Sequence, residues 1–178
     1  GKGVSKWIRG EYGTGKTFAA RYLCAKARQR GFATSEVQIS INDTPLHHLE
    51  TVYRRLIEHL ETAADGPNAF QAVVDGWLYQ IGDEVMRLKG MTEGDPGFAD
   101  ATEQRLEDKL AALSRRNPAF AQGLRAYHRA THDGDFATAQ GLLAWVAGQP
   151  FTDRSVLKEA GTKGKVDGQA ALTFLSGL

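Results

Sequence analysis

The chain of 178 residues is long enough for one domain of ordinary size, and its 42% hydrophobic and 24% charged residues are typical of a folded globular protein. The formal net charge of +1 excludes a bulk electrostatic attraction to DNA or to an anionic membrane. A single cysteine excludes a framework of internal disulfides, and no apolar run is long enough to span a bilayer, so we expect a cytoplasmic protein without a membrane partner.

The first 43 residues are predicted to form a strand, a glycine-rich loop, a helix and a second strand. Val4–Arg9 is predicted as a short strand that leads into the loop. Lys16–Arg30 is rich in helix-forming residues and is followed by Gly31, which is typical of a helix C-terminus. Phe32–Ile41 contains alternating apolar and polar residues, which indicates a second strand. This order of elements is a βαβ unit.

The rest of the chain, residues 44–178, is predicted to be all helical, because apolar residues recur there at intervals of three and four. Asp100 and Glu103 have the spacing of a capping box at the start of one of these helices. The expected helices begin near Thr44-Pro45, Phe70, Asp100, Asn117-Pro118, Phe136, Asp153 and Asp167. We expect the three tryptophans, Trp7, Trp77 and Trp145, to lie in the core, and Cys24 to be a small buried hydrophobic residue.

The residues between the first predicted strand and the first helix indicate a phosphate-binding loop. They read Gly10-Glu11-Tyr12-Gly13-Thr14-Gly15-Lys16-Thr17, which is the complete P-loop spacing. Glycines allow main-chain N–H groups to approach phosphate oxygens closely, and the helix that follows directs its free N–H groups at the same place. We expect residues 10–18, up to Phe18, to bind ATP, with Lys16 as the catalytic cation at the β- and γ-phosphates and the Thr17 hydroxyl as a ligand of Mg²⁺.

A second acidic residue, which P-loop enzymes use to hold the metal or to orient water, has no convincing candidate. Ala72-Val73-Val74-Asp75 has the required order but lies within a predicted helix, and Arg115 and Arg116 are interpreted as solvated cations at a helix end. We therefore expect this segment to bind ATP without hydrolysing it. Since two strands make too small a sheet, we also expect the natural protein to continue past Leu178 and to supply further strands.

Two weaker signals concern histidines and a polar pair. His128 and His132 are four residues apart on a predicted helix, but they lack a convincing third ligand and are interpreted as surface histidines. Asn42-Asp43 follows the second predicted strand, at the sheet edge where open α/β folds bind ligands. Capping of the next helix explains the same pair equally well, so both interpretations stay open.

The loop with Glu11 and Tyr12 inside it resembles the P-loop of the BREX ATP-binding proteins, the BrxC/BrxD family of bacterial phage-exclusion systems. The likeness is greater to the BrxD type than to the much larger BrxC type. Three further stretches resemble this family: Asn42-Asp43-Thr44-Pro45-Leu46-His47, Val52-Tyr53-Arg54 and Trp145-Val146-Ala147-Gly148.

The resemblance implies an α/β fold, with an AAA-like P-loop NTPase core in residues 1–43 and a large all-helical insertion in residues 44–178, the last helix leading back into the core. It also implies an ATPase or switch subunit in antiviral defence, with other defence proteins as partners and with DNA and self-association as open options. Two other classes fit the residues: a small-molecule or nucleotide kinase with the helical block as a lid, and a helical interaction module with a vestigial P-loop.

Overall fold

The computed structural model describes residues 4–177, apart from the side chains of residues 112 and 175–177. Within this part of the chain the protein is dominated by helices, and its one sheet has two short strands. The elements in chain order are α1 (Lys16–Gln29), β1 (Thr34–Ser35), α2 (Leu49–Glu58), β2 (Leu60–Glu61), α3 (Phe70–Lys89), α4 (Phe98–Arg116), α5 (Pro118–His132), α6 (Phe136–Val146), α7 (Arg154–Glu159) and α8 (Gly168–Gly177).

The predicted parallel βαβ unit is not formed. The strand expected at Val4–Arg9 is wrong, since these residues are neither helix nor strand. Of the strand expected at Phe32–Ile41, only Thr34–Ser35 is observed, as β1. It pairs antiparallel with β2, which follows α2 in the chain. A strand needs a partner for its N–H and C=O groups, and Val4–Arg9 has no strand partner among the described residues.

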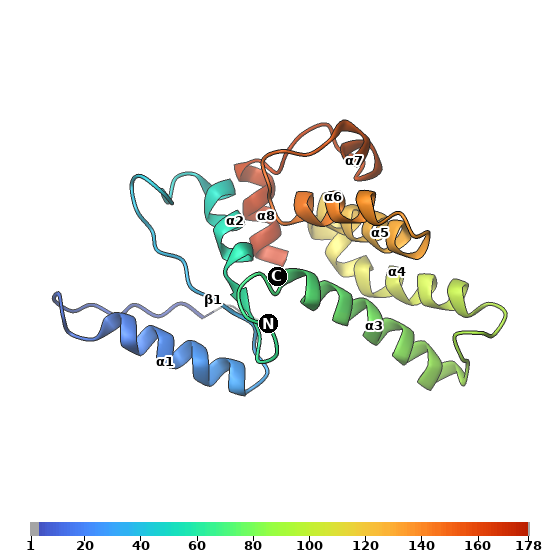
Figure 1. Ribbon diagram of the computed structural model, residues 1–178, viewed down its shortest axis with the longest axis horizontal. Helices are drawn as coiled ribbons and strands as arrows, with labels where there is room; N and C mark the ends of the chain where they lie inside the picture. The colour runs from blue at the N-terminus through green and yellow to red at the C-terminus, as the bar shows by residue number, and fades with distance from the viewer. Residues whose placement is uncertain (1–3, 178) are drawn as a thin grey trace.

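The helix predicted after the glycine loop is confirmed as α1, but it packs poorly against the rest of the chain. Its C-terminus has the expected glycine cap, in which the Phe32 amide donates to the Ala27 carbonyl at 3.1 Å. No residue of α1 is buried, and α1 lies apart from α5 and α6 in Figure 1. Polar contacts join it to the small sheet, where Arg28 lies 2.8 Å from both Glu61 and Thr34.

The helices predicted in residues 44–178 are confirmed, with corrections at two N-termini. The region is not all helical, because Leu60–Glu61 forms strand β2 and pairs with β1. The first helix begins at Leu49, not at Thr44, because Thr44 is buried and pairs with Ser40 in an isolated β-bridge. The capping box expected at Asp100 is wrong, since α4 begins at Phe98 and Asp100 lies inside its first turn. None of the helices in the described residues is both long enough and apolar enough to cross a membrane.

Side-chain caps account for the N-termini of α5 and α6. The Asn117 side chain accepts a hydrogen bond from the Phe120 amide at 3.3 Å, and Asp135 accepts one from the Thr138 amide at 3.1 Å. Each bond satisfies an amide that has no partner inside its own helix. Pro118 follows Asn117 at the first helical position, where the missing N–H has no consequence.

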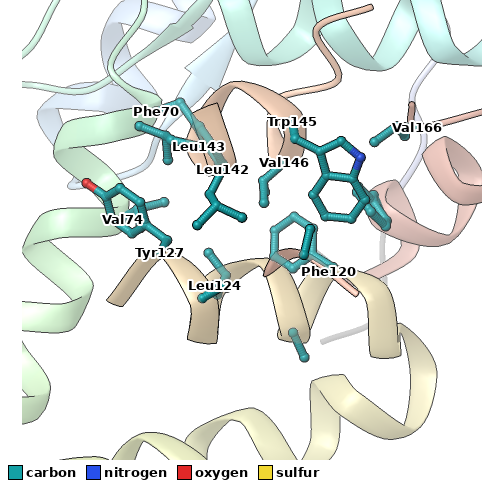
Figure 2. Packing of buried hydrophobic residues seen from close by; sticks show 14 of the residues in the cluster. Phe70, Val74, Phe120, Leu124, Tyr127, Leu142, Leu143, Trp145, Val146 and Val166 are labelled. Atoms are coloured by element: carbon teal, nitrogen blue, oxygen red, sulfur yellow. The ribbon is translucent and has the colours of Figure 1, made fainter. Parts of the chain in front are cut away.

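The core is centred on the antiparallel pair α5 and α6, as Figure 2 shows. Trp145 of α6 and Phe120 of α5 both have rings packed edge-to-face against Phe174 of α8. Close approach of α5 and α6 requires Gly123, because a Cβ atom there would lie 2.7 Å from Val146 and 2.9 Å from the Trp145 ring.

The end of α6 is joined to α2 by a buried hydrogen bond. The Tyr53 hydroxyl donates to the Val146 carbonyl oxygen at 2.6 Å, and Tyr53 is 0% exposed. Val146 is the last residue of α6, and the residue four positions later is Pro150, which has no N–H to donate. The tyrosine therefore satisfies a carbonyl that the helix leaves without a donor.

Expectations for the core were correct at two tryptophans and wrong at two other positions. Trp145 is buried and Trp77 is packed against the core. Trp7 is 95% exposed, since the strand that would have carried it is not formed. Cys24 is half-buried and not a core residue, because α1 presents its side chains mainly to solvent.

Candidate phosphate-binding loop

The predicted phosphate-binding residues form a tight loop directly before α1, and its three glycines are required for two different reasons. Gly13 and Gly15 have φ angles of 80° and 81°, a left-handed region that other residues rarely adopt. Gly10 is required for space, because a Cβ atom there would lie 2.7 Å from the Thr14 hydroxyl. A replacement at Gly13 or Gly15 would therefore strain the main chain, and one at Gly10 would displace the Thr14 side chain.

The Lys16 side chain folds back across this loop. Its ammonium donates hydrogen bonds to the carbonyl oxygens of Gly10 at 2.8 Å and Glu11 at 2.5 Å, and it lies 3.5 Å from the Thr14 hydroxyl. The Thr14 hydroxyl donates to the Glu11 carbonyl as well, at 2.8 Å. The cation is thus held by the main chain of the loop, with its charge beside the start of α1.

The N-terminus of α1 adds further positive potential at the same place. The first hydrogen bond of the helix runs from the Ala19 amide to the Gly15 carbonyl at 2.9 Å. Within the described chain no main-chain acceptor is bonded to the amides of Lys16, Thr17 or Phe18, and the first turn contains no acidic residue. Free amides at the positive end of a helix dipole are a common site for an anion.

The loop is open to solvent, and its side chains are accessible to a ligand. Tyr12 and Phe18 are largely exposed, and Thr17 at the first turn of α1 is exposed as well. Among the residues that the structure describes, none forms a hydrogen bond with the Thr17 hydroxyl. The donors at this site, which are main-chain amides and one ammonium, suit a phosphate, and the exposed hydroxyl of Thr17 is of a type that can bind Mg²⁺.

The remaining candidate residues do not join the loop. Asp75 lies in α3 and accepts a hydrogen bond from the Tyr127 hydroxyl at 2.5 Å, which agrees with its rejection as the acid at a strand end. Burial and this bond raise the pKa of Tyr127 to about 12. Arg115 and Arg116 lie in the last turn of α4, as expected for helix-end cations.

The two histidines and the pair Asn42-Asp43 are the other candidates that the sequence offered. His128 is half-buried and His132 exposed, and the described residues contain no group of three or more histidines, cysteines or carboxylates able to hold a metal. Asp43 lies in a turn in which its amide donates to the Ser40 hydroxyl at 3.0 Å. It does not cap a helix, since the next one begins at Leu49.

Sequence reasoning missed the acceptors of the Lys16 ammonium. The carbonyl oxygens of Gly10 and Glu11 belong to the main chain, so the residue types at these positions do not indicate them as acceptors. Glu11 was expected at the site, but its contact with Lys16 comes from its carbonyl group and not from its carboxylate.

The comparison with protein families adds the decisive observation to this geometry. The pattern of one family, described as BREX system ATP-binding protein BrxC/D, matches residues 1–178. The chain belongs to the BrxC/D family. BrxC/D proteins are described as ATP-binding and as part of the BREX system, which agrees with a phosphate-binding loop. No curated protein and no solved structure matches the chain.

Proposed function

We propose that residues 10–18 bind the triphosphate of ATP together with Mg²⁺, and that residues 1–43 are the nucleotide-binding part of an AAA-like P-loop NTPase closer to the BrxD type. The observation that carries this proposal is the position of the Lys16 ammonium, inside the glycine loop and beside the free amides of α1. A polyphosphate would replace the two carbonyl oxygens as the acceptor of the Lys16 ammonium and would also accept hydrogen bonds from the free amides of α1. Thr17 would hold the Mg²⁺, which neutralises phosphate charge when bound.

The helical residues 44–178 would serve as the surface that transmits nucleotide binding to other proteins of the defence system. This part contains the packed core and the α5–α6 pair, which give an interface a folded support. Among the described residues Glu61 ends β2, but it is paired with Arg28 in the last turn of α1, at the opposite end of that helix from Thr17. Asp75 is in α3 and bonded to Tyr127. We therefore propose that these residues bind ATP and do not hydrolyse it.

The test is a calorimetric titration of a non-hydrolysable ATP analogue with Mg²⁺ into wild type, Lys16→Ala and Lys26→Ala. Lys26 is the matched control, because it is an exposed lysine of the same helix whose ammonium bonds to Gln29, outside the loop. A charge-assisted bond to phosphate contributes about 1.5–3 kcal/mol, so Lys16→Ala should weaken binding by about 10- to 100-fold. Lys26→Ala should bind like wild type.

The Mg²⁺ ligand is tested separately by Thr17→Ala. This variant should still bind the analogue without metal, but it should lose most of the increase in affinity that Mg²⁺ gives to wild type. Equal affinity of wild type and Lys16→Ala would refute the phosphate site, and the P-loop would then be vestigial.

A further inference from the structure

An apolar groove runs along the antiparallel helices α3 and α4, far along the chain from the phosphate-binding loop. It lies between the first two turns of α3, the last two turns of α4 and the beginning of α5, where Phe120 and Leu124 form part of its wall. Its volume is about 570 Å³, and it is partly open to solvent. We call this surface the α3–α4 groove.

The α3 side of the groove is a stripe of apolar side chains that the chain itself covers incompletely. Phe70, Val73, Val74 and Trp77 recur at the spacing of one helix face and all line the groove. Phe70 and Val74 are buried, but Val73 is 38% exposed. An apolar stripe at the i, i+3, i+4 and i+7 positions is the surface that receives an amphipathic helix in helix-in-groove recognition.

The two charged residues that line the α3–α4 groove are both basic. Lys109 and Arg116 are the charged residues among those that line it, and both are on α4. They are seven residues apart, which is about two helical turns or roughly 10 Å along the axis. The Glu84 carboxylate accepts hydrogen bonds from Lys109 at 2.8 Å and from Arg105 at 2.6 Å. Because two cations share this one carboxylate, the α4 side of the groove keeps a net positive charge.

We propose that the α3–α4 groove binds an acidic amphipathic helix of a partner protein. The apolar stripe would take the apolar face of that helix, and acidic residues two turns apart would meet Lys109 and Arg116. The inference deepens the proposed interface of residues 44–178, but it does not depend on ATP binding.

The experiment selects partners from a displayed library of helical peptides of roughly 15 residues, about four turns, against the 178-residue chain. Library positions on one face are apolar, and the others are free to be acidic, basic or neutral. Selected peptides are then titrated by fluorescence anisotropy into wild type, Val73→Glu, Arg116→Glu and Leu88→Glu. Leu88 is the matched control, because it is a 67% exposed residue of α3 that does not line the groove.

Selected peptides should be enriched in pairs of acidic residues two turns apart. Val73→Glu should weaken their binding by at least about 30-fold, since it places a carboxylate in the apolar contact, and Arg116→Glu by about 5-fold or more. Leu88→Glu and Lys16→Ala should bind like wild type, and circular dichroism should show each variant folded. Val73 is exposed enough for its replacement to leave the core intact.

Several results would overturn the inference. These are enrichment of basic or neutral peptides, failure to enrich any peptide, equal binding by Val73→Glu and wild type, and displacement of the peptides by laurate at lower concentration than by an acidic helix. A loss of ATP binding in Lys16→Ala without a change in peptide affinity would leave both proposals standing, so the failure of either one can be distinguished.

Discussion

The hydrogen bond between Tyr53 and the end of α6 gives a sharp test of how the helical residues are held together. Replacement of Tyr53 by Phe removes the hydroxyl and keeps the ring, which packs edge-to-face against Phe174. The Val146 carbonyl would then be buried without a donor, because residue 150 is a proline. The lost bond and the unsatisfied carbonyl together cost about 1.5–3 kcal/mol.

Urea denaturation followed by far-ultraviolet circular dichroism measures this loss as a change in the free energy of unfolding. For a chain of this length the same loss lowers the melting temperature by about 3–10 °C. Tyr79→Phe is the control, since Tyr79 is 65% exposed on α3 and its hydroxyl is in solvent. It should change stability by less than about 0.5 kcal/mol. If Tyr53→Phe were as stable as Tyr79→Phe, the role assigned to the hydroxyl would be refuted.

Two further predictions concern a packing glycine and a half-buried histidine. Gly123→Ala should destabilise the chain by about 1–3 kcal/mol, because the new methyl group would overlap the Trp145 ring. Gly76→Ala, at an open position in α3, should instead stabilise the chain by about 0.5–1 kcal/mol. Equal effects of the two replacements on the free energy of unfolding in urea would contradict the packing argument. Burial, together with His132, lowers the pKa of His128, so the unfolded chain takes up this proton first as the pH falls below about 6.5. The free energy of unfolding should therefore decrease more steeply with acid in wild type than in His128→Gln, and identical slopes would exclude this contribution.

The helices of residues 44–178 could be predicted because their signals are local. The stripe from Phe70 to Val85 repeats within one helix, and the caps Asn117 and Asp135 contact amides three residues away. The strand expected at Val4–Arg9 depends on a partner from elsewhere in the chain, which no local pattern can guarantee. For the same reason the sequence could not show that Trp7 is exposed.

At the phosphate-binding loop, the spacing of glycines and lysine predicted where α1 begins. It could not predict that the Lys16 ammonium bonds to the Gly10 and Glu11 carbonyls, since these groups are present at every residue. The α3–α4 groove was missed in a similar way. The sequence predicted a helix at Val73 and a core position for Trp77, but how completely α4 and α5 cover this face of α3 depends on helix packing.

The lack of any buried residue in α1 bears on how nucleotide binding should be measured. A ligand raises the melting temperature of a protein only through the structure that unfolds together with its site. Heating reports mainly on the core around Trp145 and Phe174, to which α1 contributes no buried side chain. An unchanged melting temperature in the presence of ATP would therefore not exclude ATP binding. Slower exchange of the α1 amide hydrogens with deuterium would report ATP binding directly.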